Sequence, residues 1–342
     1  MKNIFKGKTV LVTGGTGSIG SEIVRQLLSR APRAVRVFAR HEDRHFECMQ
    51  EWAPHVDTVR FIVGDIRDKE RLALAMEGVD IVFHAAALKH VPLCEYNPFE
   101  AVKTNIVGTQ NVIEAARAAN VGHVIGISTD KAVEPESVLG VSKLMAEKLF
   151  LATYFYKGDK ETKFTCVRFG NVLASRGSIL ALIRKQVREG LPVTLTDPAM
   201  TRFVMTIPQA VSLVLDAVAL GKGQEIFVLK MPAARLCDLF AAAVAHYAVL
   251  LGKKEKDIAT KVIGRRGGEK MHERLLADHE IPYALETKSM YILTPNQTAF
   301  AEYTAAYRAS PVSSRSKGFL SASARKLSRK DLRALFKEVD GA

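Results

Sequence analysis

The chain has 342 residues, of which 48% are hydrophobic and 25% are charged, so it is not a disordered protein and can form one large domain or two unequal ones. Its formal net charge of +13 is spread along the sequence without a nucleic-acid-binding motif, which argues against nucleic acid as a partner and favours a small anionic ligand. The four cysteines stand far apart and form no CxxC or Cys/His cluster, so we expect reduced thiols and no metal site.

Short apolar runs alternate with amphipathic segments along the first two thirds of the chain. The expected strands are residues 9–13, 35–38, 60–63, 81–84, 124–128, 164–168 and 226–229, and the expected helices include residues 21–29 and 99–119. Continuous apolar strands that alternate with helices predict an α/β fold, with a doubly wound parallel sheet that is covered on both faces.

The alternation weakens after about residue 175, where glycine and proline separate shorter elements. We therefore expect a first domain over residues 1–175, to which residues of about 205–230 add later strands, and a smaller α/β region over residues 176–342. No signal peptide precedes the first strand, and the most apolar helical run, residues 239–251, is too short to cross a bilayer. These features predict a cytoplasmic protein without membrane insertion.

A glycine-rich turn follows the first expected strand and leads directly into a helix, in the pattern TGxxGxxG. Glycines allow the backbone to approach a pyrophosphate, and a helix N-terminus offers N–H groups and a partial positive charge. Strand, turn and helix in this order predict a dinucleotide site rather than a plain glycine turn. The expected contacts from this turn are Thr13, Gly14, Thr16, Gly17, Ser18, Ile19 and Gly20.

The end of the second strand indicates which dinucleotide binds. An NAD enzyme usually has an acidic residue there, but this chain has Arg40. A guanidinium group pairs with phosphate in a forked geometry, so Arg40 favours NADP, with Arg44 as a second contact to the 2′-phosphate. The alternative is that Arg40 is an ordinary surface residue.

Further cofactor contacts are expected where the next strands end. Asp65 and Ile66 follow the third strand, where the edge of the adenine would lie. Ala85 and Ala86 follow the fourth strand, and their small side chains let a dinucleotide lie close to the backbone. Asn105 lies in the following helix.

These features resemble the extended short-chain dehydrogenase/reductase superfamily. Further motifs are similar to the UDP-N-acetylglucosamine 4,6-dehydratase family of bacterial polysaccharide biosynthesis, and to its soluble, capsule-type members in particular. The motifs are KHVP at 89–92, STDKAV at 128–133, RFGNV at 168–172, SRGS at 175–178, MTRF at 200–203 and RGGEKMHE at 266–273. The resemblance runs from about residue 5 to at least residue 275 and implies that residues 1–175 form an NADP-binding Rossmann domain and residues 176–342 mainly bind substrate.

The resemblance implies a three-step reaction on UDP-N-acetylglucosamine. Hydride leaves C4 of the sugar, water is lost across C5 and C6, and the hydride returns at C6 to give a UDP-4-keto-6-deoxy-N-acetylhexosamine for capsule or surface-glycan synthesis. Capsule-type members favour inversion at C5, but retaining relatives exist and the sequence does not decide between them. A UDP-sugar 4-epimerase or reductase and a non-catalytic NADP-binding protein are the alternatives. The resemblance also implies a homo-oligomer, such as a hexamer.

Catalytic roles follow from the same resemblance. Asp130 is expected to be the acid for the departing C6 hydroxyl and Lys131 the base at C5. We expect burial to raise the pKa of Asp130 and to lower that of Lys131. The alternative is a solvated surface pair.

The superfamily's Tyr-x-x-x-Lys pair is incomplete in this chain. Lys143 is present and is expected to hold the nicotinamide ribose, but Leu139 stands at the tyrosine position, which argues against an epimerase or a simple dehydrogenase. Thr129 or Ser128 is expected to hydrogen-bond the C4 oxygen. The base for the C4 hydroxyl stays open between Asp130 and a water ordered by Thr129 and Lys143.

The remaining motifs supply the expected substrate contacts. Lys89 and His90 are expected to reach the sugar or its diphosphate, and Lys89 also lies near the cofactor. Arginines match diphosphate oxygens and a carboxylate can accept from ribose hydroxyls, although any one arginine could instead form a structural ion pair. The expected UDP clamp is Asn171, Ser175, Arg176, Arg202, Arg266 and Glu269. His272 and Glu273 end the last motif without an assigned role.

Overall fold

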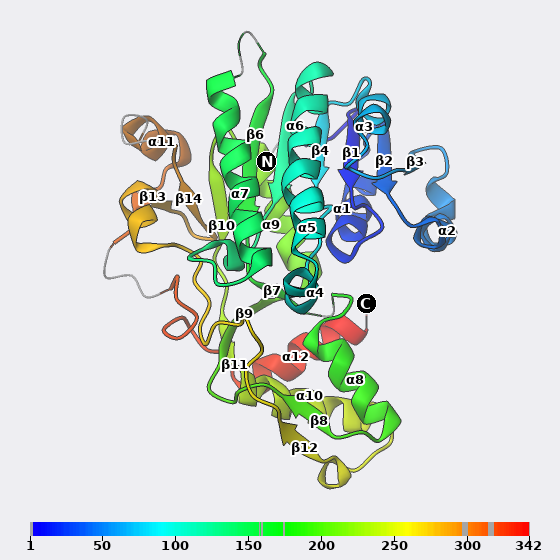
Figure 1. The fold of residues 1–342 in the computed structure, drawn as a ribbon, viewed down its shortest axis with the longest axis vertical. Coiled ribbons are helices and arrows are strands. Elements are labelled where there is room, and N and C mark those ends of the chain that lie inside the picture. The colour runs from blue at the N-terminus through cyan, green and yellow to red at the C-terminus, as the bar shows by residue number, and fades with distance from the viewer. Residues whose placement is uncertain are drawn as a thin grey trace.

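A computed structural model describes residues 3–156, 158, 160–173, 175–295, 300–313 and 318–341. Its larger part is a parallel sheet in the order β3–β2–β1–β4–β5–β6–β10 (Figure 1). The strands are β1 (Thr9–Thr13), β2 (Ala34–Ala39), β3 (Val59–Val63), β4 (Ile81–His84), β5 (His123–Ile127), β6 (Lys163–Arg168) and β10 (Ile226–Leu229). The strand order reverses between β1 and β4, which is where sheets of this class bind ligands.

The expected strands and the fold class are confirmed. Residues 9–13, 81–84 and 226–229 match the observed strands, and the other expected strands differ from them by a residue or two at their ends, where hydrogen bonds fray. All five residues of β1 are buried, because β2 and β4 pair with its edges, with Val12 beside Val37 and Phe83, and helices cover both faces of the sheet. This burial on both faces explains why the strands read as continuous apolar runs.

Helices cover both faces of the sheet. On one face α1 (Ser18–Leu28) packs against α9 (Ile207–Leu220), and on the other α6 (Gly108–Ala118) packs against α3 (Lys69–Met76) and α7 (Val138–Ala152). The helix expected over residues 99–119 is continuous but not uniform, because a π-helical segment (Val102–Val107) joins α5 (Pro98–Ala101) to α6. The remaining helices of this part are α2 (Glu42–Glu51) and α4 (Val91–Tyr96).

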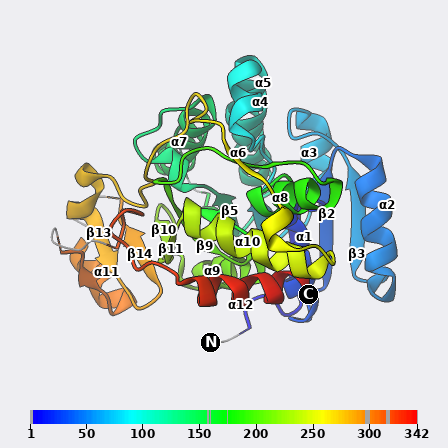
Figure 2. The ribbon, with the colours of Figure 1, turned by 90° about the horizontal axis from the view of Figure 1, so that it is seen from below.

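The chain returns to the main sheet after residue 280. Three antiparallel strands extend the sheet beyond β10, in the order β14 (Met290–Leu293), β13 (Ala284–Glu286) and β15 (Ser310–Pro311). Helix α11 (Phe300–Tyr307) connects β14 to β15 in the chain. Figure 2 shows these elements at one end of the sheet and β3 with α2 at the other. The sequence pattern did not predict this extension, because strands of two to four residues are too short for periodicity to reveal.

A second, smaller unit lies beyond the carboxyl ends of the parallel strands (Figure 1). In it, α10 (Leu236–Leu250) packs against α8 (Ile179–Glu189) and α12 (Arg329–Asp340), and their apolar faces form a separate core. Strand β8 (Val193–Leu195) pairs with β12 (Thr260–Val262). Strands β7 (Asn171–Val172), β9 (Thr201–Met205) and β11 (Ala233–Arg235) form a three-stranded sheet between the two units.

Short 3₁₀ turns complete the fold at Ala53–His55 (η1), Asp130–Ala132 (η3), Thr153–Tyr156 (η4), Glu255–Asp257 (η5) and Asp278–Tyr283 (η6). None of the helices in the described ranges has the length and apolar character that crossing a bilayer requires.

Candidate active site

A cavity of about 700 Å³ lies at the carboxyl ends of the parallel strands, against the smaller unit. Its wall combines the β1–α1 turn and the ends of β2 to β5 with residues of α8, β8, β9 and α10. The predicted residues in this wall are Gly14, Thr16, Gly17, Ser18, Ile19, Gly20, Arg40, Asp65, Ile66, Ala85, Ala86, Lys89, His90, Ser128, Thr129, Lys131, Lys143, Asn171, Ser175, Arg176, Arg202, Arg266 and Glu269. The predicted residues outside this wall are Thr13, Arg44, Asn105 and Asp130.

The glycine turn is shaped as a dinucleotide site requires. Gly14 has a φ of +67°, and a Cβ there would lie 2.7 Å from the backbone nitrogen of Ala86. A Cβ on Gly20 would overlap the carbonyl oxygen of Gly14. Helix α1 then begins at Ser18 without a side-chain cap on its first N–H groups, so these groups are available to an anion. The turn therefore fits a pyrophosphate.

Arg40 and Asp65 form the wall beyond the turn. Nη1 of Arg40 lies 3.6 Å from Oδ2 of Asp65, and Arg67 binds the same carboxylate oxygen at 2.7 Å. Burial raises the pKa of Asp65, but its bonds to Arg67 outweigh burial and the pKa is lowered. Arg44 lies apart from this wall on α2, where Nη1 binds Glu47 at 2.7 Å. Of the two predicted 2′-phosphate contacts, only Arg40 faces the cavity.

Thr13 and Asn105 lie outside the residues that line the cavity and bond to groups in or after β4. Oγ1 of Thr13 is 2.8 Å from Nδ1 of His84, and the amide of Asn105 bonds both the N–H and the carbonyl oxygen of Leu88. Both residues therefore hold β4 and the segment that follows it, and their expected role as cofactor contacts stays a prediction. His84 is fully buried, and burial together with Lys143 lowers its pKa to about 3. It stays neutral and structural.

Lys143 and Leu139 line the cavity from α7. Nζ of Lys143 donates to the carbonyl oxygen of Ile127 at 2.6 Å, and burial lowers the pKa of this lysine. Leu139 is buried and leaves an apolar wall where the superfamily has a phenol. Ser128, next to Ile127 in the chain, donates to Glu147 Oε1 at 2.6 Å.

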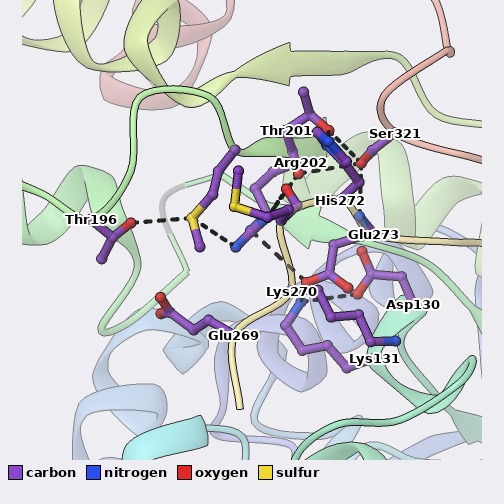
Figure 3. Close-up of polar contacts among 12 residues, drawn as sticks. Asp130, Lys131, Thr196, Thr201, Arg202, Glu269, Lys270, His272, Glu273 and Ser321 are labelled. Atoms are coloured by element: carbon purple, nitrogen blue, oxygen red, sulfur yellow. Dashed lines mark hydrogen bonds and ion pairs between the residues drawn. The ribbon is translucent and has the colours of Figure 1, made fainter. Parts of the chain in front are cut away.

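Asp130, Lys131 and Glu273 form a group of charges near the tip of β5, in which both carboxylates are buried. Figure 3 shows the two carboxylates converging on the ammonium of Lys131, with distances of 3.0 Å to Oδ1 of Asp130 and 3.2 Å to Oε1 of Glu273. Asp130 is fully buried and Glu273 is 2% exposed. Of the three residues, only Lys131 lines the cavity, and the expected role of Asp130 as the acid stays a prediction.

The protonation states of this group differ in part from expectation. Burial raises the pKa of Asp130, as expected for an acid, and Glu273 raises it further against the opposing effect of Lys131. The expected lowering of the pKa of Lys131 is wrong. Burial does act in that direction, but Asp130 and Glu273 outweigh it and hold the pKa at about 12. The protein without ligands therefore has a protonated Lys131.

Arg176, which we expect in the UDP clamp, lies against the glycine turn. Its guanidinium donates to the carbonyl oxygen of Thr16 at 3.0 Å, and its own carbonyl oxygen accepts from Lys89 Nζ at 2.6 Å. Burial lowers the pKa of Lys89, and Arg176 lowers it further. Two crowded cations in one wall are suited to an anionic ligand.

The other clamp residues enclose the side of the cavity nearest the smaller unit. Arg202 on β9 donates to the carbonyl oxygens of Thr201 and Met271, and its Nε lies 3.9 Å from Glu273. Arg266 is exposed, and its backbone N–H donates to Glu269 at 3.4 Å. The sequence did not predict the apolar part of this wall, contributed by Leu180, Leu182, Leu236 and Leu239, nor the contact of Glu273 with Lys131.

No group of metal-binding side chains occurs within the described ranges.

Glu273 stands in the same motif as Arg266 and Glu269. Its place in that motif was the one sign in the sequence that Glu273 could belong to the site.

Comparisons with known proteins agree on the family. Residues 10–295 match the model of a family described as polysaccharide biosynthesis protein. An "uncharacterized membrane protein" of Methanocaldococcus jannaschii is 53% identical over 86% of this chain and 88% of its own length. A UDP-N-acetylglucosamine 4,6-dehydratase (inverting) of Campylobacter jejuni is 39% identical over 86% of this chain and 84% of its own length.

Two further comparisons concern activity and fold. A UDP-glucose 4-epimerase of Rickettsia canadensis is also 39% identical, over 84% of this chain and 83% of its own length. The X-ray structure of Pen from Bacillus thuringiensis superposes with a TM-score of 0.88 at 41% identity, covering 98% of each chain.

Proposed function

The chain belongs to the polysaccharide biosynthesis protein family and is an enzyme of the extended short-chain dehydrogenase/reductase type, and from this premise we propose that it is an NADP-dependent UDP-N-acetylglucosamine 4,6-dehydratase. We further propose that it inverts C5 and serves capsule or surface-glycan synthesis. The inverting Campylobacter jejuni relative supports the choice of substrate and of stereochemistry.

The observation that carries the proposal is an acid–base pair beside an apolar residue. Lys131 lines the cavity with buried Asp130 bonded to it, and Leu139 stands in the same wall. Elimination of water needs an acid for the leaving hydroxyl and a base for the carbon-bound proton. An epimerase of this superfamily would use a tyrosine at position 139, and leucine cannot transfer a proton.

The cavity fits a nicotinamide dinucleotide. Gly14 and Gly20 allow the close turn that a pyrophosphate requires, and Arg40 supplies a cation that favours NADP over NAD. When bound, the dinucleotide would supply reversible hydride acceptance, taking a hydride from C4 of the sugar and returning it at C6. Lys143 would hold the nicotinamide ribose, as the resemblance implies.

Asp130 would provide the proton for the departing C6 hydroxyl. Its burial keeps a proton on the carboxyl group at a pH where an exposed aspartate would be ionised. Because Asp130 lies behind Lys131, the proton must pass through Lys131 or Thr129, and Thr129 Oγ1 lies 3.1 Å from Oδ1 of Asp130. We therefore assign the acid role to Asp130 together with the Lys131 and Thr129 side chains bonded to it, and not to one isolated side chain.

Lys131 would exchange the proton at C5. Since the free protein holds it as an ammonium ion, it must release a proton to water in the cavity that it lines as the sugar binds, before it can accept one from C5. The same ammonium form can deliver a proton to C5 in the later step. Inversion would follow if that delivery reached the face opposite to the one from which the proton left.

The substrate would lie toward the smaller unit. Arg202 and Arg266 would bind the diphosphate, with Glu269 accepting from ribose hydroxyls and His90 near the sugar. Arg176 would contact the cofactor's diphosphate, because it lies against the glycine turn.

A second candidate is a UDP-sugar 4-epimerase, favoured by the 39% identity to the Rickettsia canadensis protein. One assay distinguishes the candidates: the protein is incubated with UDP-N-acetylglucosamine and NADP in the absence of a reductant, and the products are measured by mass spectrometry. Loss of one water supports the dehydratase, and a product of unchanged mass supports the epimerase. Unchanged substrate contradicts both. Proton NMR of the product formed in deuterated water then reports the configuration at C5.

We also propose that the chain forms a homo-oligomer. Tyr96 and Phe99 are 85% and 79% exposed, and Val141 on the adjacent α7 is 53% exposed. Helix α4 packs against α7, so these side chains belong to one region of the surface. Exposed apolar surface of this kind is typical of a protein interface. Light scattering coupled to size-exclusion chromatography tests this, and a monomeric mass would contradict it.

A further inference from the structure

Glu273 is held rigidly by segments that lie far apart in the sequence. Its backbone N–H donates to Ser321 Oγ at 2.8 Å, and its carbonyl oxygen accepts from the N–H of Ser321 at 2.8 Å. Ser321 Oγ is in turn 2.7 Å from Thr201 Oγ1, which also bonds Nδ1 of His272 (Figure 3). The backbone at Glu273 therefore cannot easily move away from β9.

The side chain of Glu273 contacts Lys131 and has one carboxylate oxygen without a partner. Oε1 lies 3.2 Å from Lys131 Nζ and 3.9 Å from Nε of Arg202. Neither Oε2 of Glu273 nor Oδ2 of Asp130 has a hydrogen-bond partner among the described residues, although both atoms are buried. A Cβ on Gly170 would lie 2.7 Å from Oδ2 of Asp130, so this glycine makes room for the carboxyl group.

Two buried carboxylates thus share one ammonium group. When carboxylates lie this close, repulsion favours a state in which one is ionised and the other keeps a proton. Glu273 has two further cations near it, Arg202 and Lys270, whereas the only cation that acts on Asp130 among its main neighbours is Lys131. The negative charge is therefore more stable on Glu273.

The directions of the pKa shifts of Glu273 and Asp130 agree with a negative charge on Glu273 and a proton on Asp130. Burial raises the pKa of Glu273, but Lys131, Arg202 and Lys270 outweigh burial and lower it. Burial raises the pKa of Asp130, and the opposing effect of Lys131 does not cancel the combined effects of burial and Glu273. A pair of acids whose pKa values are separated by their surroundings is a common arrangement for assigning one of them as a proton donor.

We propose that Glu273 is a positioning residue that holds Lys131 in the cavity wall and, by carrying the negative charge of the carboxylate pair, keeps the proton on Asp130. The proposal rests on the proposed dehydratase function, because the proton on Asp130 matters for catalysis only if Asp130 is the acid of that reaction. Glu273 does not line the cavity, so it acts through its two neighbours.

The test is a titration of Asp130 in the full-length protein without substrate. Carboxyl groups of aspartate are labelled with ¹³C, the Asp130 signal is assigned from its loss in Asp130→Asn, and its chemical shift is followed against pH. In the unsubstituted protein we expect a midpoint above the ordinary aspartate value of about 3.9. In Glu273→Gln we expect the midpoint to fall by about one pH unit or more, because Lys131 then has Asp130 as its main counter-ion.

Two control variants separate charge from structure. Glu273→Asp keeps the charge, and its Asp130 midpoint should stay closer to that of the unsubstituted protein than the midpoint in Glu273→Gln does. Glu280→Gln removes another carboxylate, 15% exposed, whose partner is Arg168 at 2.9 Å, and should leave the Asp130 midpoint unchanged. An unchanged midpoint in Glu273→Gln overturns the proposal. If that variant does not fold, an ordinary or lower midpoint in the unsubstituted protein overturns it equally.

The catalytic consequence is measured separately. In the water-loss assay, Glu273→Gln should move the alkaline limb of the kcat profile to lower pH and leave KM nearly unchanged. A uniform loss of kcat at every pH would instead indicate a purely structural role and contradict the proposal. If the unsubstituted protein does not dehydrate the sugar, the proposed function fails, while the carboxyl titration still decides whether Glu273 controls the proton on Asp130.

Discussion

The guanidinium of Arg176 donates a hydrogen bond to the carbonyl oxygen of Thr16, 3.0 Å away, although 160 residues separate them in the sequence. The backbone N–H of Arg176 also donates to Ser18 Oγ at 3.0 Å, so the loop before α8 is attached to the glycine turn at two points. Because Lys89 binds the carbonyl oxygen of Arg176, this loop connects the turn to the wall that follows β4. A cofactor bound at the glycine turn is therefore expected to contact this loop.

Replacement of Arg176 by methionine should weaken cofactor binding. The substitution removes a cation next to the expected position of the pyrophosphate, and hydrogen bonds to charged groups contribute about 1.5–3 kcal/mol, so the Kd for NADP should rise about tenfold or more. Isothermal titration calorimetry measures this. Arg188→Met is the matched control, because Arg188 is exposed on α8 and lies outside the cavity wall. The Kd of this variant for NADP should not change. Equal affinities in the two variants would refute a role for Arg176 in binding the cofactor.

Arg40→Ser should reduce the preference for NADP. Arg40 lies in the cavity wall, so its loss should raise the Kd for NADP about tenfold or more and leave the Kd for NAD nearly unchanged. Arg44→Ser should alter neither value by more than about twofold, because Arg44 is bound to Glu47 outside the wall. Fluorescence titration with both dinucleotides tests the pair of variants. A larger effect from Arg44 would reverse the assignment of the 2′-phosphate contact.

Asp130→Asn should abolish dehydration while preserving the fold. Loss of a general acid typically costs about 10²- to 10⁴-fold in kcat, and asparagine has nearly the same volume as aspartate. A single-turnover experiment that follows the absorbance of the reduced nicotinamide then resolves which step is lost. If the cofactor is still reduced when sugar is added, Asp130 is not the base for the C4 hydroxyl, and the water ordered by Thr129 and Lys143 becomes the assignment.

Because the buried Arg168 pairs with the partly exposed Glu280, the protein should become less stable in acid. Burial raises the pKa of Glu280, but Arg168 outweighs it, so the folded-state pKa lies below the value in the unfolded chain. The carboxylate of Glu280 therefore stabilises the fold above the ordinary glutamate pKa of about 4.3, and this contribution disappears as the pH falls through the lower folded-state value.

Urea unfolding at a series of pH values tests this contribution. Glu280→Gln should lower the free energy of unfolding at pH 7 by about 1–3 kcal/mol, because Glu147 still pairs with Arg168 at 2.7 Å. The difference between the variant and the unsubstituted protein should shrink as the pH falls below about 4. A difference that stays constant with pH would show that Glu280 acts only through packing.

Much of the fold could be predicted from the sequence because its signals are local. The strands and the glycine turn depend on periodicity, on β-branched residues and on glycines at fixed spacing, and all of these are properties of short segments. The added antiparallel strands β13 to β15 could not be predicted, since they have only two to four residues each. They are stabilised by pairing with one another and, through β14, with β10.

The candidate site was predictable as a set of residue types but not as a set of contacts. The resemblance identified Arg176 as a ligand contact, but the sequence contains no sign that it faces Thr16 rather than the nucleotide sugar. The expected low pKa of Lys131 was wrong for the same reason. Burial alone would lower it, and the second carboxylate, from Glu273, is 142 residues away along the chain.

By itself, the sequence determined the parallel sheet, the place of the dinucleotide turn and the absence of a phenol at position 139, because each of these depends on neighbouring residues or on one residue's chemistry. The tertiary structure alone decided which charges meet. Electrostatic interactions in a buried site depend on distances of a few ångströms between segments that the chain brings together only when it folds, and those distances are what hold Lys131 protonated beside Asp130 and Glu273.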